Sequence, residues 1–138
     1  MKMMKRRLRS RTKVLLPTDA ELLILDALWE LGEGTVEDVV NRSPSNPRAN
    51  YKTVQTLLRI MENKGFVKHT TRGRAFVFMS CVTRDEIGRV SAKRLVDRNF
   101  QGSHTSMLMN LLDSNDIKED ELDALERLIQ QYRERKTK

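Results

Sequence analysis

At 138 residues, with 38% hydrophobic and 33% charged side chains, the chain is long enough for one ordinary domain with an added helical segment, and too short for two large domains. No apolar run approaches the roughly eighteen residues that a membrane-spanning helix needs, so the sequence predicts no membrane insertion. The net charge is +7, and the surplus comes from residues 42–82, which hold eight basic side chains and one acidic side chain. This distribution favours a polyanionic partner, with a solubilising basic surface as the alternative.

The N-terminal segment is basic and lacks the features of a secretory signal. Residues 1–13 carry seven basic side chains but no apolar stretch followed by a cleavage site of small residues, so we expect the protein to stay in the cytoplasm. Residues 1–16 are predicted to form a flexible arm, which either stays disordered or folds onto a polyanion.

Neither the cysteine content nor the histidine content indicates a metal site. The single cysteine, Cys81, cannot form an internal disulfide and is expected at the end of a strand. His69 and His104 have no neighbouring ligands at a useful spacing, and we expect them on a strand and at a helix start. The sequence therefore predicts no cofactor and no metal.

Two helices are predicted after the arm. Thr18 and Glu21 have the spacing of a capping box, which begins a helix that runs to about Leu31 and ends at Gly32. Helical spacing assigns its core face to Ile24, Ala27, Leu28 and Leu31, widened by Leu25 and Trp29. A second, short helix over residues 36–40 has an acidic first turn and its valines on one face.

A third helix is predicted from Asn50, a good N-cap, to Lys64, and Pro44 and Pro47 make the preceding stretch a loop. Its inward-facing positions are Val54, Leu57, Leu58 and Met61. Its outward-facing positions are Tyr51, Lys52, Gln55 and Arg59, with Thr53 and Thr56 at the margins. The outward face is polar and basic, and it carries no carboxylate before Glu62.

A β-hairpin is predicted after the third helix. Phe66–His69 and Ala75–Met79 favour strands, and residues 70–74, which include Gly73, are expected to form the turn. Three helices followed by a hairpin is the order of a winged helix-turn-helix, whose third helix enters the major groove of DNA while the hairpin touches the neighbouring backbone. We therefore predict a DNA-binding domain over residues 17–81.

The outward residues of the third helix have the chemistry that groove recognition needs. Amide and hydroxyl groups pair with base edges, which makes Gln55 and Thr56 the favoured base readers. Lys52 and Arg59 are expected on phosphates, and Asn50 presents the N–H groups of a helix start to a phosphate. The predicted DNA-binding set is completed by Tyr51, Thr53, Arg72 and Arg74. An ordinary solvated helix face and a generic charged turn are the alternatives.

Residues 82–138 are predicted to form a helical dimerisation domain. A capping box at residues 83–86 begins a helix to about Phe100, with candidate buried positions at Ile87, Val90, Leu95 and Val96. Helices over residues 103–112 and 118–135 follow, and the last carries an apolar stripe at Leu122, Leu125, Leu128, Ile129 and Tyr132. The stripe faces either a core or a partner helix, and a partner is favoured. The predicted fold class is mainly α with a small antiparallel β-hairpin (α+β).

Four segments match the pattern of a known family: Thr18–Glu21 through Leu28–Trp29, Tyr51–Leu58, Lys64–Gly65 and Gly73–Phe78. With them, residues 16–135 resemble the penicillinase-repressor (BlaI/MecI) family of bacterial winged-helix repressors, a group that also includes copper-responsive repressors. The resemblance implies an N-terminal DNA-binding domain and a C-terminal dimerisation domain. It further implies a homodimer that represses β-lactamase or related genes from a palindromic operator.

The resemblance also implies how repression ends. In such repressors a membrane sensor protease triggers cleavage at an Asn-Phe bond in the dimerisation region, and Asn110 and Leu111 are the matching pair here. Leucine replaces phenylalanine at this bond, which departs from the family pattern. The copper-responsive relatives carry paired Cys-x-Cys motifs near the C-terminus for soft metal ions, and this chain has none.

Three alternatives compete with a sequence-specific repressor. A non-sequence-specific nucleic-acid-binding protein would show the same charge and the same basic arm. A winged helix can also serve only as a protein-interaction module. An enzyme needs converging nucleophile, base or metal groups, which this sequence does not offer, so we expect no catalytic activity.

Overall fold

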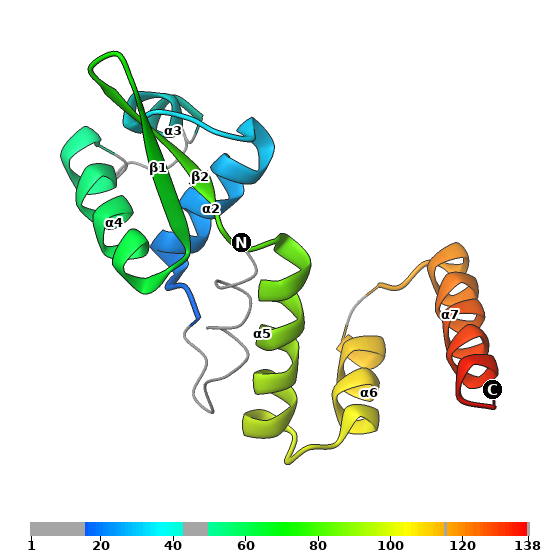
Figure 1. Cartoon of the computed structure of the whole chain (residues 1–138). Helices are drawn as coiled ribbons and strands as arrows, with labels where there is room; N and C mark the ends of the chain where they lie inside the picture. Colours follow the sequence, from blue (N-terminus) through cyan, green and yellow to red (C-terminus); the bar gives the residue numbers. More distant parts are fainter. Residues whose placement is uncertain (1–15, 43–49, 115, 138) are drawn as a thin grey trace. The chain divides into compact units, whose positions relative to one another are not determined.

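The computed structural model describes residues 16–42, 50–114 and 116–137. Within these ranges the chain forms six helices and a two-stranded antiparallel sheet, in the predicted order of three helices, a hairpin and three helices (Figure 1). The predicted α+β fold class is therefore confirmed. The predicted N-terminal arm, apart from its last residue, and the predicted loop at Pro44 and Pro47 lie outside the described residues.

The described helices are α2 (Asp19–Leu31), α3 (Val36–Arg42), α4 (Tyr51–Lys64), α5 (Arg84–Asn99), α6 (His104–Ser114) and α7 (Glu119–Thr137), and the strands are β1 (Val67–Arg72) and β2 (Ala75–Ser80). The chain divides into two units, Met1–Lys93 and Arg94–Lys138, and the division falls inside α5. Among the described residues, no helix is both long and apolar enough to span a bilayer.

The capping box predicted at the start of α2 is confirmed. The Thr18 hydroxyl accepts a hydrogen bond from the Glu21 N–H at 3.2 Å, and the Glu21 carboxylate accepts one from the Thr18 N–H at 2.9 Å. Glu21 is only 1% exposed, and its carboxylate also lies 2.9 Å from the Nζ atom of Lys64 at the end of α4. A buried carboxylate needs such a cation, so this pair joins the start of α2 to the end of α4.

The core of the first unit is formed by α2, α3, α4 and the hairpin. Its largest fully buried apolar side chains include Leu25, Leu28, Leu58, Met61 and Phe66. The inward positions predicted for α4 are buried at Val54, Leu58 and Met61, while Leu57 is half-buried against the core. Leu31, which the periodicity assigned to the core face of α2, is 37% exposed. It is the last residue of the helix, and the backbone turns at Gly32, where φ is 84°.

The hairpin is longer than predicted, because both strands extend to a two-residue turn. β1 pairs with β2 along its whole length and leaves only Gly73 and Arg74 between the strands. The turn predicted over residues 70–74 is therefore wrong at Thr70, Thr71 and Arg72, which belong to β1, and the β-branched side chains of the two threonines favour a strand. Gly73 has a φ of 62°, the positive value that two-residue hairpin turns require at their first central position.

The hairpin is attached to the loop between α2 and α3. Gly34 and Phe78 exchange two backbone hydrogen bonds, of 2.9 and 2.8 Å, as an isolated antiparallel bridge. Gly34 is buried, and a Cβ atom at this position would lie 3.1 Å from the Cβ atom of Asp38. The small residue therefore allows the loop to approach β2 and to tie the hairpin to the helices.

Trp29 joins α2 to the start of α5. Its indole Nε1 donates hydrogen bonds to the Val82 carbonyl at 2.9 Å and to the Ser80 hydroxyl at 3.1 Å. The Arg84 guanidinium lies 4.7 Å from the ring centroid and also pairs with the Asp26 carboxylate at 2.9 Å. Trp29 is therefore part of the packed framework, as the sequence predicts.

The connection from β2 to α5 contains the second predicted capping box. The Thr83 hydroxyl accepts from the Glu86 N–H at 3.0 Å, and the Glu86 carboxylate accepts from the Thr83 N–H at 2.9 Å. Cys81 directly follows β2, as expected, and its partial burial raises the pKa of its thiol. In α5 Val96 is buried, whereas Leu95, also predicted to be buried, is 46% exposed, because adjacent residues point about 100° apart around a helix.

The helices of the second unit, α6 and α7, contain no fully buried side chain. α6 begins at His104, as expected, after Ser103, whose hydroxyl accepts a hydrogen bond from the Ser106 N–H at 3.1 Å. α7 has an acidic first turn and a basic last turn, an arrangement that suits the helix dipole. The apolar side chains of both helices therefore keep at least partial contact with solvent in a single chain.

Candidate nucleic-acid interface

The start of α4 is built by Asn50. This residue has an extended backbone conformation, and its side-chain oxygen accepts a hydrogen bond from the Thr53 N–H at 2.8 Å. The predicted N-cap is therefore confirmed. The cap keeps the first turn of α4 at an exposed surface, where the helix dipole and the backbone N–H groups favour an anion.

The outward face of α4 brings six of the predicted DNA-binding residues together. All six are exposed: Tyr51, Lys52, Thr53, Gln55, Thr56 and Arg59. The opposite face is buried, so the helix cannot turn its polar face inward without exposing core residues. Before Glu62, the only charged side chains of the helix are those of Lys52 and Arg59, so this part of the face carries positive charge and no negative charge.

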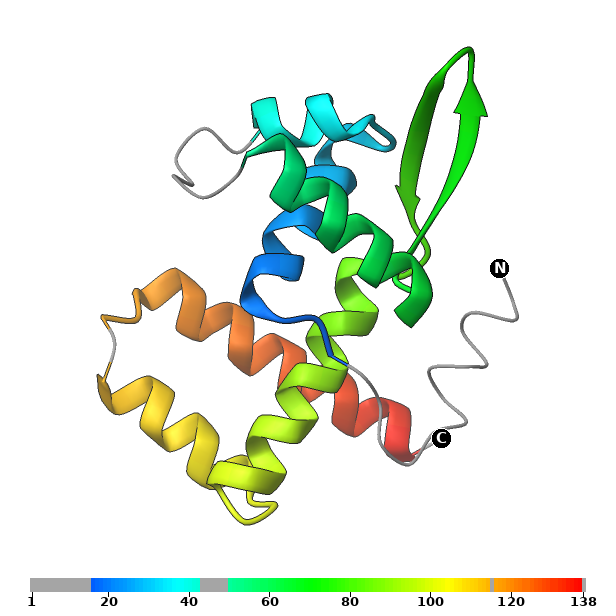
Figure 2. The same ribbon diagram turned by 90° about the vertical axis from the view of Figure 1, so that its left-hand side faces the viewer.

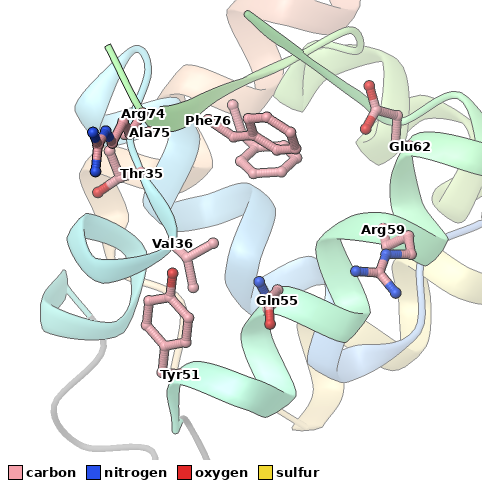
Figure 3. A pocket seen from close by; sticks show the side chains of 10 residues that line it. Thr35, Val36, Tyr51, Gln55, Arg59, Glu62, Arg74, Ala75 and Phe76 are labelled. Carbon is pink, nitrogen blue, oxygen red and sulfur yellow. The ribbon is translucent and has the colours of Figure 1, made fainter. Parts of the chain in front are cut away.

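A cleft of about 330 Å³ lies between α4, the start of α3 and the hairpin. Four predicted residues line it: Tyr51, Gln55 and Arg59 from α4, and Arg74 from the turn. α4 and β1 contact each other, and both ribbon views show the base of the hairpin beside the C-terminal end of α4 (Figure 1 and Figure 2). Figure 3 shows Gln55 and Arg59 of α4 on one side of the cleft and Phe76 of the hairpin on the other. Residues of the helix and of the hairpin therefore converge on one concave surface.

The remaining predicted residues of α4 line a shallower hollow of the same helix. Lys52, Thr53 and Thr56 form it together with the half-buried Leu57. The two favoured base readers, Gln55 and Thr56, are thus adjacent in sequence but lie in different hollows. Together the two hollows extend the polar surface across the width of the helix.

The two arginines predicted at the hairpin tip have different surroundings. Arg74 is the second residue of the turn and lines the cleft. Arg72 ends β1, and its guanidinium forms an ion pair with the Glu33 carboxylate in the loop between α2 and α3. Exposed pairs of this kind add little stability. The carboxylate nevertheless offsets the positive charge of Arg72, so Arg74 is the better placed of the two for a phosphate.

The structure also brings together three residues that the sequence did not indicate. The Nδ1 atom of His69 lies 2.8 Å from both carboxylate oxygens of Glu62, and its ring stacks on that of Phe76 with centroids 4.2 Å apart. Phe78 adds a tilted ring contact at 5.5 Å. The residues come from α4, β1 and β2, so only the register of the strands reveals the cluster. The one signal in the sequence is a histidine in a predicted strand, seven residues after the isolated acid Glu62.

The side chains of the interface are suited to binding a ligand through hydrogen bonds, positive charge and ring contacts. The part of the chain that the structure describes contains no cluster of three or more histidine, cysteine, aspartate or glutamate side chains placed to hold a metal ion. The interface offers amide, hydroxyl, guanidinium and ammonium groups and two exposed aromatic rings, those of Tyr51 and Phe76. Such groups bind phosphates, sugars and base edges.

Curated relatives match nearly the whole chain. It is 24% identical over 119 residues to the penicillinase repressor of Bacillus licheniformis, a match that covers 86% of this chain and 93% of that protein. It is 20% identical over 112 residues to the methicillin resistance regulatory protein MecI of Staphylococcus aureus (strain N315), which covers 81% of this chain and 91% of that protein.

Among solved structures, a MarR family protein from Bacillus stearothermophilus matches with a TM-score of 0.50 and 22% sequence identity, over 99% of this chain and 87% of that chain. This likeness shows the winged-helix fold. The sequence profile of the family described as penicillinase repressor matches residues 17–131, from the capping box of α2 into α7. The chain therefore belongs to the penicillinase-repressor family, whose members are DNA-binding transcriptional repressors and not enzymes.

Proposed function

We propose that this repressor is sequence-specific and that it binds a palindromic operator as a homodimer. α4 lies in the major groove, and the hairpin turn meets the neighbouring phosphate backbone. The observation that carries the proposal is the exposed face of α4, which presents amide, hydroxyl and cationic side chains and no acid before Glu62. In this proposal residues 17–81 form the DNA-binding domain and residues 82–138 the dimerisation domain.

The residues of the interface divide into two roles. Gln55 and Thr56 read base edges, because an amide pairs with adenine and a hydroxyl pairs with several base atoms. Lys52, Arg59 and Arg74 hold phosphates and fix the register of the protein on the duplex. The helix start at Asn50 contributes N–H groups to the same backbone contacts. Tyr51 and Thr53 flank these groups on the exposed face.

The dimer is supported by the apolar stripe of α7. Leu122 and Leu125 are half-buried, and the three further members of the stripe, Leu128, Ile129 and Tyr132, are about half exposed in the single chain. A second copy would cover this stripe and would link two recognition helices, which is how a dyad site is read.

The regulated genes and the inducing signal are proposed by analogy with the relatives. Their names refer to penicillinase and to methicillin resistance, so we propose β-lactamase or related genes as targets. The pair Asn110 and Leu111, proposed for cleavage in a pathway with a membrane sensor protease, is exposed on α6. The Asn110 side chain donates to the Ser106 carbonyl at 3.0 Å within the helix, so α6 must open locally before a protease can cleave there.

Selection from a pool of randomised duplexes tests the proposal. The full-length protein should enrich an inverted repeat with half-site centres about 10 base pairs, or a multiple of that, apart. At physiological salt it should bind the enriched duplex about 10³-fold or more tightly than a scrambled duplex of the same composition. Equal affinity for the two duplexes would contradict sequence specificity and would support the alternative of a non-sequence-specific nucleic-acid-binding protein.

A further inference from the structure

We propose that Glu62, His69 and Phe76 form a strut that holds the hairpin in a fixed position relative to α4, with His69 as the positioning residue. The strut places Arg74 against the DNA backbone while Gln55 reads bases. The inference rests on the proposed function, because the strut has this role only when DNA lies across both α4 and the hairpin.

The geometry of the strut connects three elements through one side chain. On one side, the Nδ1 atom of His69 is 2.8 Å from each carboxylate oxygen of Glu62, which comes from α4. On the other side, the His69 ring stacks on Phe76 of β2 with an interplanar angle of 21°. Histidine is suited to this place because it combines a flat ring with a hydrogen-bonding nitrogen.

The hairpin is attached to the helices on two sides, and the strut is its attachment on the side of α4. A two-stranded hairpin is marginally stable by itself, so its direction depends on what holds it. The loop between α2 and α3 holds one side, through the bridge of Gly34 to Phe78 and the ion pair of Glu33 with Arg72. The strut holds the side that faces α4. The cleft lies between these attachments, and its width depends on both.

Charge gives the strut a second consequence for DNA binding. Glu62 is the only acidic residue in residues 42–82, and it lines the same cleft as Arg59 and Arg74. An uncompensated carboxylate there repels phosphates. The Nδ1 atom of His69 lies 2.8 Å from this carboxylate, so the strut also fixes where the negative charge of the cleft lies.

A double-mutant cycle with H69Q and R74A tests the positioning role. The probe is the duplex that the wild-type protein enriches from a randomised pool, with affinity measured for the full-length protein at one salt concentration. If the strut positions Arg74, R74A weakens binding in the wild-type background and has little effect beside H69Q, a coupling of about threefold or more. Multiplicative effects of the two substitutions would overturn the proposal, because they would show that His69 acts independently of the turn.

The chain's other histidine supplies the matched control for this cycle. His104 is exposed at the start of α6, outside the strut. R74A should weaken binding equally in H104Q and in the wild-type background. A coupling of R74A to H104Q as large as its coupling to H69Q would overturn the proposal.

A second substitution keeps the test decisive if H69Q alone unfolds the hairpin. H69F retains a ring for Phe76 and loses the partner of Glu62, so it should lose the coupling to R74A while keeping its unfolding temperature. H69F that behaves like the wild type would overturn the strut. Failure of the proposed function is distinguishable, because the selection would then enrich no inverted repeat, or R74A would bind as tightly as the wild type.

Discussion

In the first unit the inner faces of α2 and α4 bury large apolar side chains together, whereas the apolar side chains of α6 and α7 in the second unit are half-buried or exposed. The exposed faces of the two units differ as well. The exposed face of α4 is polar and basic, whereas that of α7 carries an apolar stripe. The first unit thus contains a core that can fix a recognition surface by itself. The second offers a surface that association would bury. Substitutions on the exposed face of α4 should therefore impair DNA binding without affecting association. Substitutions in the stripe of α7 should impair association without unfolding the first unit.

The largest effect is expected from breaking the stripe. The double variant L125D/I129D should be a monomer, and its operator affinity should fall by about 10²- to 10⁴-fold, because two linked half-site contacts become one. Sedimentation and operator binding measure the two effects. Q130D, at an exposed position of the same helix, is the control and should remain a dimer. An unchanged dimer in L125D/I129D would show that the stripe is not the interface.

The next largest effect is expected on the stability of the first unit, and it distinguishes buried from exposed apolar side chains of α4. Leu58 is fully buried, so L58A should lower the free energy of unfolding of the first unit by about 2–5 kcal/mol. I60A, on the same helix but at an exposed position, should cost far less. Denaturant unfolding measures both, and sedimentation should show that L58A still associates at temperatures where it is folded. Equal losses in the two variants would contradict the assignment of the core face.

A smaller effect should appear in sequence discrimination alone. Q55A removes an amide that is exposed and outside the core, so unfolding and dimerisation should not change. Discrimination between the enriched operator and variants at one base pair should fall by about 1–3 kcal/mol. N63A, an exposed amide at the other end of α4, is the control. If Q55A weakens all sequences alike, Gln55 holds the backbone and does not read bases.

The smallest effect distinguishes the two arginines of the hairpin. R74A should weaken operator and scrambled duplexes alike and reduce the slope of log affinity against log salt by about one, because one phosphate contact is lost. R72A should change this slope less, since Glu33 already offsets the charge of Arg72. A larger change in R72A than in R74A would reverse the assignment.

Sequence periodicity is reliable where one physical cause dominates. The core face of α4 follows from the spacing of Val54, Leu58 and Met61, and both capping boxes form because their bonds join residues three apart. Spacing is less reliable at element ends, where Leu31 and the hairpin turn were predicted wrongly. There the path of the backbone, and not the repeat, decides whether a side chain is covered.

Long-range pairs could not be predicted from the sequence. The partner of Arg72 lies in the loop before α3, and the partner of His69 lies on α4, so both pairs depend on where the hairpin folds. The stripe of α7 is a different case, because a single sequence does not say whether an apolar face is covered by its own chain or by a copy. The structure of one chain shows its members half-buried or exposed, which sharpens the question to one of association.

The buried carboxylate of Glu21 restricts the movements by which this repressor can release DNA. It forms an ion pair with Lys64, the last residue of α4, and so fixes the C-terminal end of α4 to α2. A rotation or a slide of α4 would pull that ammonium away and strand a charge in the interior, at a cost of about 3–5 kcal/mol for buried pairs in general. Release by twisting the recognition helix in place is therefore disfavoured. In the proposed homodimer, separating the two copies would release the operator at a lower cost, because each α4 keeps its position and only the contacts with the second half-site are lost.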